Sequence, residues 1–175
     1  MHAFARGLLM ATLIASGGSK AATAPPTRPP CAAPEYRQFD FWVGEWRVVS
    51  GSDEAKALGT SRVARDPSNC WITEHWHSAQ GTDGTSLNAW DAGSHVWRQF
   101  WTGTDGTVLR LQGGLRDGAM VLEGGLPRAK GGEQRQRLTW TARGDGSVTQ
   151  HWETSDDDGA HWVTSFLGVY RRQGP

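Results

Sequence analysis

Five Asp-Gly dipeptides follow one another along the chain from residue 83 onward, beginning at Asp83, Asp105, Asp117, Asp145 and Asp158. This dipeptide favours the type I′ turn, because both central residues of that turn take a positive φ. The segments between the dipeptides are short and carry β-branched and aromatic residues, and no window after residue 45 has helical periodicity. The pattern predicts an all-β domain that is built from successive hairpins.

Further breaks are expected at the glycine pairs of residues 113–114, 124–125 and 131–132. About ten strands in successive hairpins predict an antiparallel up-and-down β-barrel, because closing the sheet removes its edges. A two-sheet sandwich is the alternative, but it favours longer crossover loops, which the sequence lacks. The expected strands span residues 46–50, 59–65, 70–78, 85–91, 96–102, 108–112, 119–123, 134–142, 147–154 and 161–171.

The first residues predict a secretory signal sequence. Arg6 supplies a positive start, residues 8–15 form a short apolar core, and small residues follow, with cleavage expected near Ala21 or Ala22. The apolar run is too short to span a bilayer, so no membrane span is expected. We therefore expect a secreted or periplasmic protein.

Three regions follow from this pattern: a signal peptide at residues 1–22, a linker at 23–34 and a barrel domain at 35–175. The linker is rich in Ala and Pro, which predicts a solvated, partly extended segment. Within the domain, residues 35–43 are expected to form a short plug in front of the first strand. Their aromatic side chains lead directly into a glycine and a tryptophan.

Charge and cysteine content limit the possible partners. Without the signal peptide, 16 Lys and Arg remain against 18 Asp and Glu, a net charge near −2. A binder of nucleic acid or of anionic membranes would show a basic excess, so neither partner is expected. Cys31 and Cys70 are the only two cysteines, and in an exported protein such a pair predicts one disulfide.

Gly44-Glu45-Trp46, at the entry to the first expected strand, is similar to the Gly-x-Trp opening of the lipocalin and calycin barrels. Further aromatic motifs follow in order along the chain, and together they resemble a family of secreted, lipocalin-like bacterial domains of unknown function. That resemblance implies a barrel fold and an exported location, and it implies no reaction. The motifs lie at residues 39–48, 70–76, 86–91, 97–101, 150–155, 158–162 and 170–172.

The same resemblance suggests how the barrel closes. In lipocalins a cation at the end of the last strand stacks on the opening tryptophan, which here would be Trp46. Arg171 or Arg172 occupies the corresponding place, and Arg171 is taken as the candidate; an Arg pair that only solvates the C-terminus is the alternative. After Trp46 the sequence Arg47-Val48-Val49 lacks the glycines of haem-binding members, so neither haem nor another cofactor is expected.

Strand alternation predicts which side chains face the interior. In residues 85–91 the choice between Leu87 with Ala89 and Asn88 with Trp90 stays open, and Asn88 is carried forward as a candidate. In residues 96–102 the face with Val96, Arg98 and Phe100 is the alternative to the one carried forward. The expected inward residues are Ile72, Glu74, Trp76, Trp97, Gln99, Trp101, Val148, Gln150 and Trp152.

An interior that mixes tryptophans with amides and a carboxylate favours a binding cavity. An unpaired buried polar group costs about 1–3 kcal/mol, whereas a ligand site combines apolar walls with a few placed polar groups. We expect a small, partly apolar ligand, aromatic or lipid-like. The alternative is a structural or interaction domain of the cell envelope, with a filled barrel whose polar groups satisfy one another or ordered water. The expected ligand-binding residues are Glu74, Asn88, Gln99 and Gln150 for orientation, and Trp76, Trp101 and Trp152 for stacking.

The sequence supports a metal site or a catalytic site less well than a binding cavity. His75 and His77 share a strand face, and His95 or His151 could add a third metal ligand, but that face is assigned to solvent. No metal site is therefore expected. The sequence contains no motif for an activated nucleophile. Glu74 could act as an acid or base if burial raised its pKa, which makes a barrel enzyme the alternative to a binding protein.

Overall fold

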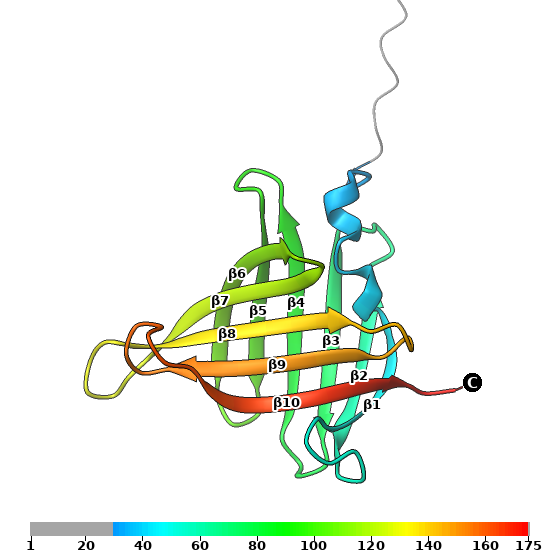
Figure 1. Cartoon of the computed structure of the whole chain (residues 1–175). Coiled ribbons are helices and arrows are strands. Elements are labelled where there is room, and N and C mark those ends of the chain that lie inside the picture. Colours follow the sequence, from blue (N-terminus) through cyan, green and yellow to red (C-terminus); the bar gives the residue numbers. More distant parts are fainter. Residues whose placement is uncertain (1–29, 175) are drawn as a thin grey trace, which may run out of the picture.

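The computed structural model describes residues 30–174, which form one closed β-barrel preceded by two short helical turns (Figure 1). Each strand pairs antiparallel with the next one along the chain, and the last strand pairs with the first. The predicted antiparallel up-and-down barrel of about ten strands is confirmed. The elements are η1 (Pro34–Arg37), η2 (Asp40–Trp42), β1 (Gly44–Ser50), β2 (Ala57–Arg65), β3 (Trp71–Ser78), β4 (Asp83–Asp91), β5 (Val96–Gly103), β6 (Val108–Arg116), β7 (Ala119–Pro127), β8 (Glu133–Ala142), β9 (Val148–Ser155) and β10 (Val163–Arg172).

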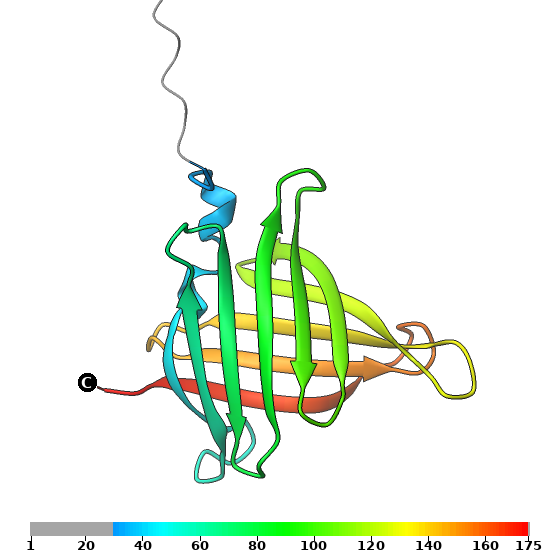
Figure 2. The ribbon, with the colours of Figure 1, turned by 180° about the vertical axis from the view of Figure 1, so that it is seen from behind.

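Opposite walls of the barrel cross each other. Strands β2–β5 run up the back of the view in Figure 1, while β8–β10 run across its front, and Figure 2 shows the same crossing from behind. Such crossing is expected of a closed sheet, because its strands tilt relative to the barrel axis.

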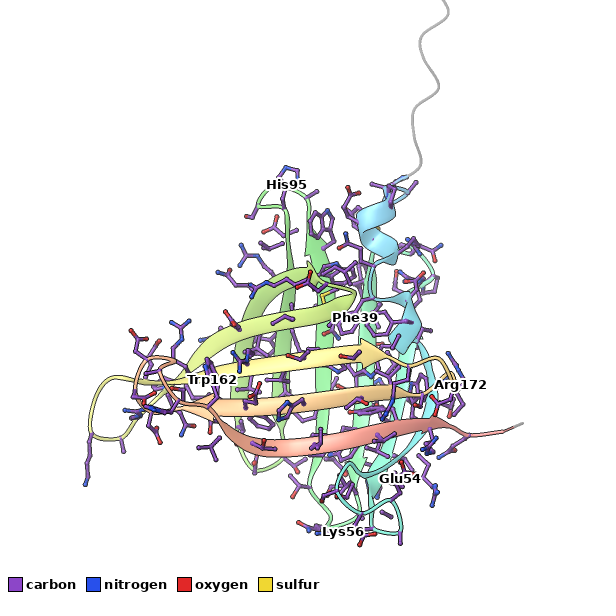
Figure 3. All side chains as sticks on the ribbon, in the orientation of Figure 1. Phe39, Glu54, Lys56, His95, Trp162 and Arg172 are labelled. Atoms are coloured by element: carbon purple, nitrogen blue, oxygen red, sulfur yellow. A yellow bond between two sulfur atoms is a disulfide. The ribbon has the colours of Figure 1, made fainter. Side chains whose placement is uncertain are left out.

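The two ends of the barrel differ. We call the end where β1 begins the plug end, and the opposite end, where β1 ends and β2 begins, the mouth. Because neighbouring strands are antiparallel, β3, β5, β7 and β9 also run from the plug end to the mouth. Figure 3 labels Phe39 close to the plug end, and Lys56 and Trp162 in loops at the mouth.

The plug, residues 34–43, fills its end of the barrel with aromatic rings. Phe39 and Trp42 have no exposed surface, and their stacked ring centroids lie 4.9 Å apart. The Trp140 ring, from the barrel wall, meets Phe39 edge to face at 5.2 Å. The Trp42 carbonyl accepts a hydrogen bond from Trp46 Nε1 at 2.9 Å, which joins the plug to the first strand.

Cys31 and Cys70 form the predicted disulfide, with their Cα atoms 5.1 Å apart. The bond ties the segment before η1 to the loop between β2 and β3 at the plug end. Arg37 adds a second tie, because its Nη2 donates to the carbonyls of Cys31 at 3.0 Å and Asn69 at 2.6 Å. The segment before the plug is thus anchored to the barrel at two points.

Four of the five Asp-Gly dipeptides lie in loops between strands, as predicted, but a positive φ at both residues occurs only at Asp117-Gly118 and Asp158-Gly159. Asp117 and Gly118 form the two-residue link between β6 and β7, with φ values of 50° and 80°. The dipeptides at Asp105, Asp145 and Asp158 also lie in loops between strands.

Three of the expected turn signals lie inside strands instead. Asp83-Gly84 begins β4, and the turn before it falls at residues 79–82. The glycines at 113–114 and 124–125 continue β6 and β7. Gly113 and Gly124 allow close packing of the strands: a Cβ on Gly113 would lie 2.0 Å from the carbonyl oxygen of Val121, and one on Gly124 would lie 2.2 Å from that of Arg110.

The cation that stacks on Trp46 is Arg172, so the assignment of this role to Arg171 is wrong. The Arg172 guanidinium carbon lies 4.5 Å from the ring centroid. Trp46 and Arg172 are directly paired across β1 and β10 and therefore share a face of the sheet. Arg171 projects to the opposite face, where it pairs with Glu54 at 2.8 Å and Asp145 at 3.3 Å.

The signal peptide expected at residues 1–22, and the linker as far as residue 29, lie outside the described residues. Residues 30–33 lead directly into η1. Within residues 30–174, no helix has the length and apolar character needed to cross a membrane.

Candidate ligand-binding cavity

A cavity of about 410 Å³ lies inside the barrel and reaches the mouth. The mouth ends of β2, β3 and β10 line its outer part, and residues of β8, β9 and β10 nearer the plug line its inner part. The lining residues are Ala57, Leu58, Glu74, Trp76, Ser78, Gln80, Thr82, Gln99, Trp101, Leu109, Leu138, Trp140, Gln150, Trp152, Ser165, Phe166 and Tyr170.

Three strands that run toward the mouth each present a polar side chain and then a tryptophan to this cavity. Alternate residues of a strand share a face, so each polar group lies one layer deeper than the tryptophan two residues later. The cavity therefore has a polar inner layer beneath an aromatic outer layer. The pairs are Glu74 with Trp76 on β3, Gln99 with Trp101 on β5, and Gln150 with Trp152 on β9.

Strand β10 also contributes one aromatic residue to each layer, but it runs in the opposite direction. It runs from the mouth to the plug end, so Phe166 lies nearer the mouth and Tyr170 lies deeper. The Phe166 ring meets Trp76 edge to face, with centroids 6.0 Å apart. Leu109 and Leu138 complete the apolar wall.

Two of the tryptophan rings pack against glycines on neighbouring strands. A Cβ on Gly84 would lie 2.1 Å from the Trp101 ring, and one on Gly59 would lie 2.9 Å from the Trp76 ring. Both rings thus cover strand positions that have no side chain. A larger residue at Gly84 would displace the Trp101 ring, whereas one at Gly59 would first meet the backbone carbonyl oxygen of His77 at 2.2 Å.

A chain of hydrogen bonds leads to the Glu74 carboxyl group. Ser61 Oγ donates to Oε1 of Glu74 at 2.9 Å, and Ser86 Oγ donates to Oε2 at 3.2 Å. Asn88 Nδ2 donates to Ser86 Oγ at 2.9 Å, and Gln99 Nε2 donates to Asn88 Oδ1 at 2.7 Å. Strands β2, β3, β4 and β5 each contribute to this chain, and every donor in it points toward the carboxyl group.

Burial sets the electrostatics of the inner layer. It raises the pKa of Glu74 from 4.5 to about 7, although the hydrogen bonds from Ser61 and Ser86 partly oppose the shift. Burial, and next the nearby Glu74 charge, raise the pKa of Tyr170 well above its ordinary value near 10. The Tyr170 hydroxyl donates to Gln150 Oε1. The cavity thus combines an acid that titrates near neutral pH with a tyrosine that stays protonated.

A hydrogen bond to a buried glutamine holds one tryptophan of the outer layer in place. Trp152 Nε1 donates to Gln136 Oε1 at 2.8 Å, and Gln136 is fully buried. Gln136 Nε2 in turn donates to Gln134 Oε1 at 3.0 Å. These bonds fix the orientation of the Trp152 ring.

The predicted inward faces are confirmed, whereas the role of these residues in ligand binding stays a prediction. Asn88 faces inward behind the lining, where it holds Gln99, and the alternative residue Leu87 is 47% exposed. The other six predicted ligand-binding residues line the cavity: Glu74, Trp76, Gln99, Trp101, Gln150 and Trp152.

Sequence reasoning missed Tyr170, Phe166 and Trp140 as cavity residues. The alternation of β8 carries a usable signal, since Leu138 and Trp140 share a face. The alternation of β10 does not, because Phe166 and Tyr170 share one face while the apolar residues Leu167 and Val169 share the other.

The histidines considered as metal ligands lie elsewhere. His75 and His77 are exposed on the outer face, as predicted, and His77 pairs with Asp83. His151 Nε2 lies 2.8 Å from Thr164 Oγ1. Over residues 30–174 no group of three or more His, Cys, Asp or Glu side chains is placed to hold a metal ion.

No protein-family model and no curated protein matches this sequence. The class of protein is therefore described by its fold and its cavity alone. The chain forms a closed ten-stranded β-barrel that is plugged at one end and has an internal cavity reaching the other.

Proposed function

We propose that this protein is an exported, lipocalin-like binding protein that holds a small, partly apolar molecule inside its barrel. The observation that carries the proposal is the cavity of about 410 Å³, with its aromatic wall and few polar groups. Small-molecule sites commonly have volumes of about 300–1,000 Å³ and this mixture of side chains.

The layering of the cavity suggests how the ligand lies. Its apolar part would contact Trp76, Trp101 and Trp152 in the outer layer. Its polar end would face Glu74 and Gln99 in the inner layer. A molecule bound this way enters through the mouth with its polar end first.

Two further features support the export and lipocalin-like parts of the proposal. The disulfide between Cys31 and Cys70 is typical of proteins that reside in an oxidising compartment. The Gly-x-Trp opening leads into a closed barrel, and a C-terminal arginine stacks on its tryptophan, which is the arrangement expected from the lipocalin resemblance.

A barrel enzyme is the second candidate, and one observation favours it. The pKa of Glu74, raised to about 7 by burial, suits general acid or base catalysis near neutral pH. In that case the substitution Glu74→Gln should abolish turnover while the ligand still binds. A bound molecule that is released chemically unchanged would favour the binding protein.

The substitution Gly84→Ala is expected to weaken the binding of an apolar molecule. The new Cβ would lie 2.1 Å from the Trp101 ring, so the ring must move from its seat and alter the cavity wall. An aromatic contact contributes about 0.5–1.5 kcal/mol, so we expect up to about a tenfold loss of affinity. The measurement is fluorescence titration with the uncharged dye N-phenylnaphthylamine.

Gly114→Ala is the matched control. A Cβ on Gly114 meets no atom within 4 Å, so this variant should bind the dye like the wild-type protein. Equal affinity of all three proteins would place the dye outside the cavity and would count against the proposal. Absence of dye binding by the wild-type protein would also count against it.

A further inference from the structure

The cavity carries one charged side chain. Glu74 is 4% exposed and lines the inner layer, and no Lys, Arg, His or Asp of the described chain joins it in the lining. An anionic ligand would meet this carboxylate without a compensating cation, which is costly inside a protein. The single charge therefore selects against ligands such as fatty acids.

The Glu74 carboxylate still has capacity to accept hydrogen bonds. Its two oxygens offer about four acceptor positions, and Ser61 and Ser86 occupy one on each oxygen. Gln99 lines the cavity beside this group, and within residues 30–174 its Oε1 has no hydrogen-bond partner. The inner layer thus presents unused acceptors to a group that donates several hydrogen bonds.

The layer above these acceptors is aromatic. Trp76, Trp101 and Trp152 each follow a polar residue by two positions, so their rings line the path between the mouth and Glu74. The face of an aromatic ring attracts a cation, and tryptophan does so best. Rings of this kind also contact the apolar body of a ligand.

We propose that the ligand of this cavity is a protonated organic amine with an aromatic or branched apolar body. Its ammonium group lies at Glu74 and Gln99, and its body lies among the three tryptophans. This inference rests on the proposed function and adds the chemical class of the ligand.

The groups around Glu74 determine how binding depends on pH. Ser61 faces it from β2, Ser86 from β4 and Tyr170 from β10, and of these Tyr170 alone can titrate. Tyr170 stays neutral through pH 8, because its pKa lies well above 10. The carboxyl group titrates near pH 7, so lowering the pH from about 8 to about 6 removes most of its charge and should weaken amine binding about tenfold.

The test uses three probes that share a phenyl ring and a two-carbon arm: phenethylamine, phenethyl alcohol and phenylacetate. Isothermal titration calorimetry of the full chain at about pH 8 compares their affinities. Hydrogen bonds to charged groups contribute more than neutral ones, so the amine should bind at least about tenfold more tightly than the alcohol. The carboxylate should bind more weakly than the alcohol.

The substitution Glu74→Gln should reduce the affinity for the amine to that for the alcohol, while Glu45→Gln, on the exposed outer face, should change nothing. The inference is overturned if the alcohol or the carboxylate binds as tightly as the amine, or if Glu74→Gln leaves the preference intact. It is also overturned if N-phenylnaphthylamine binds and phenethylamine does not, a result that leaves the proposed function standing. If neither the dye nor any of the three probes binds, the proposed function fails as well.

Discussion

Replacing Trp42 with alanine is expected to lower the free energy of unfolding by about 3–5 kcal/mol. Trp42 has no exposed surface and is among the largest fully buried side chains of the described residues. Its ring contacts Phe39, Trp140 and Tyr170, with centroid distances of 4.9, 5.3 and 6.3 Å. The truncation would leave a void between the plug and the barrel. Denaturant unfolding followed by circular dichroism measures the change.

Trp71→Ala is the control for this substitution. Trp71 lies on the outer face and is 38% exposed, so its loss should change the unfolding free energy by about 1 kcal/mol or less. Trp42→Phe should fall between the two, because Trp42 Nε1 has no hydrogen-bond partner among the described residues and phenylalanine removes that buried donor. An effect of Trp42→Ala no larger than that of Trp71→Ala would contradict the structural role of the plug.

The second large expected effect is an increase in the free energy of unfolding when Glu74 is replaced with glutamine. Glu74 has a pKa of about 7 in the folded protein and 4.5 as its ordinary value, so folding favours its protonated form. Its full contribution to stability is present below about pH 4.5 and is lost as the pH rises through 7. The loss amounts to about 3 kcal/mol at about pH 8. Glu74→Gln removes this titration, so the variant should be more stable than the wild-type protein at about pH 8.

Unfolding free energies at about pH 4.5 and about pH 8 measure this difference. Glu45→Gln should keep the pH dependence of the wild-type protein, because Glu45 is exposed on the outer face. A wild-type protein whose stability has the same pH dependence as that of Glu74→Gln would show that Glu74 does not titrate in this range. Retention of a destabilising buried acid at a cavity wall is typical of a functional group.

Much of the fold could be predicted because its signals are local. A turn such as Asp117-Gly118 depends on the conformations of its own two residues. Alternation within each strand groups the residues of β3, β5 and β9 that line the cavity onto one face, although on β5 it left open which face is inside. The cysteine pair needed no spatial information, since Cys31 and Cys70 had only each other as partners.

The sequence-based predictions were wrong or incomplete where the role of a residue depends on the position of a neighbouring strand. Gly113 reads as a break in the sequence, but it serves the close approach of Val121 on β7. The choice between Arg171 and Arg172 depends on the register of β10 against β1, which pairs Arg172 with Trp46. Phe166 and Tyr170 were missed for a similar reason: β10 has apolar residues on both faces, and its pairing with β1, which places Tyr170 opposite Val48, decides which face lies inside.

The polar-then-tryptophan pairs that build the cavity were visible in the sequence as three short Glu-x-Trp or Gln-x-Trp motifs. That the three pairs line one cavity was not visible, since it requires the registers of several strand pairs. The raised pKa of Glu74 was not visible either, because it comes from burial of the carboxyl group inside the closed barrel, which the hydrogen bonds from Ser61 and Ser86 only partly oppose.

Native mass spectrometry of the full chain, purified from its own cells, tests the central claim most directly. The expected result is one small molecule bound per chain that is lost on denaturation, and the released molecule can then be identified by its mass. A chain that carries no small molecule, and that also fails to bind N-phenylnaphthylamine, would contradict the claim. Glu74, Gln99 and Gln150 would then be structural groups of a barrel that binds nothing.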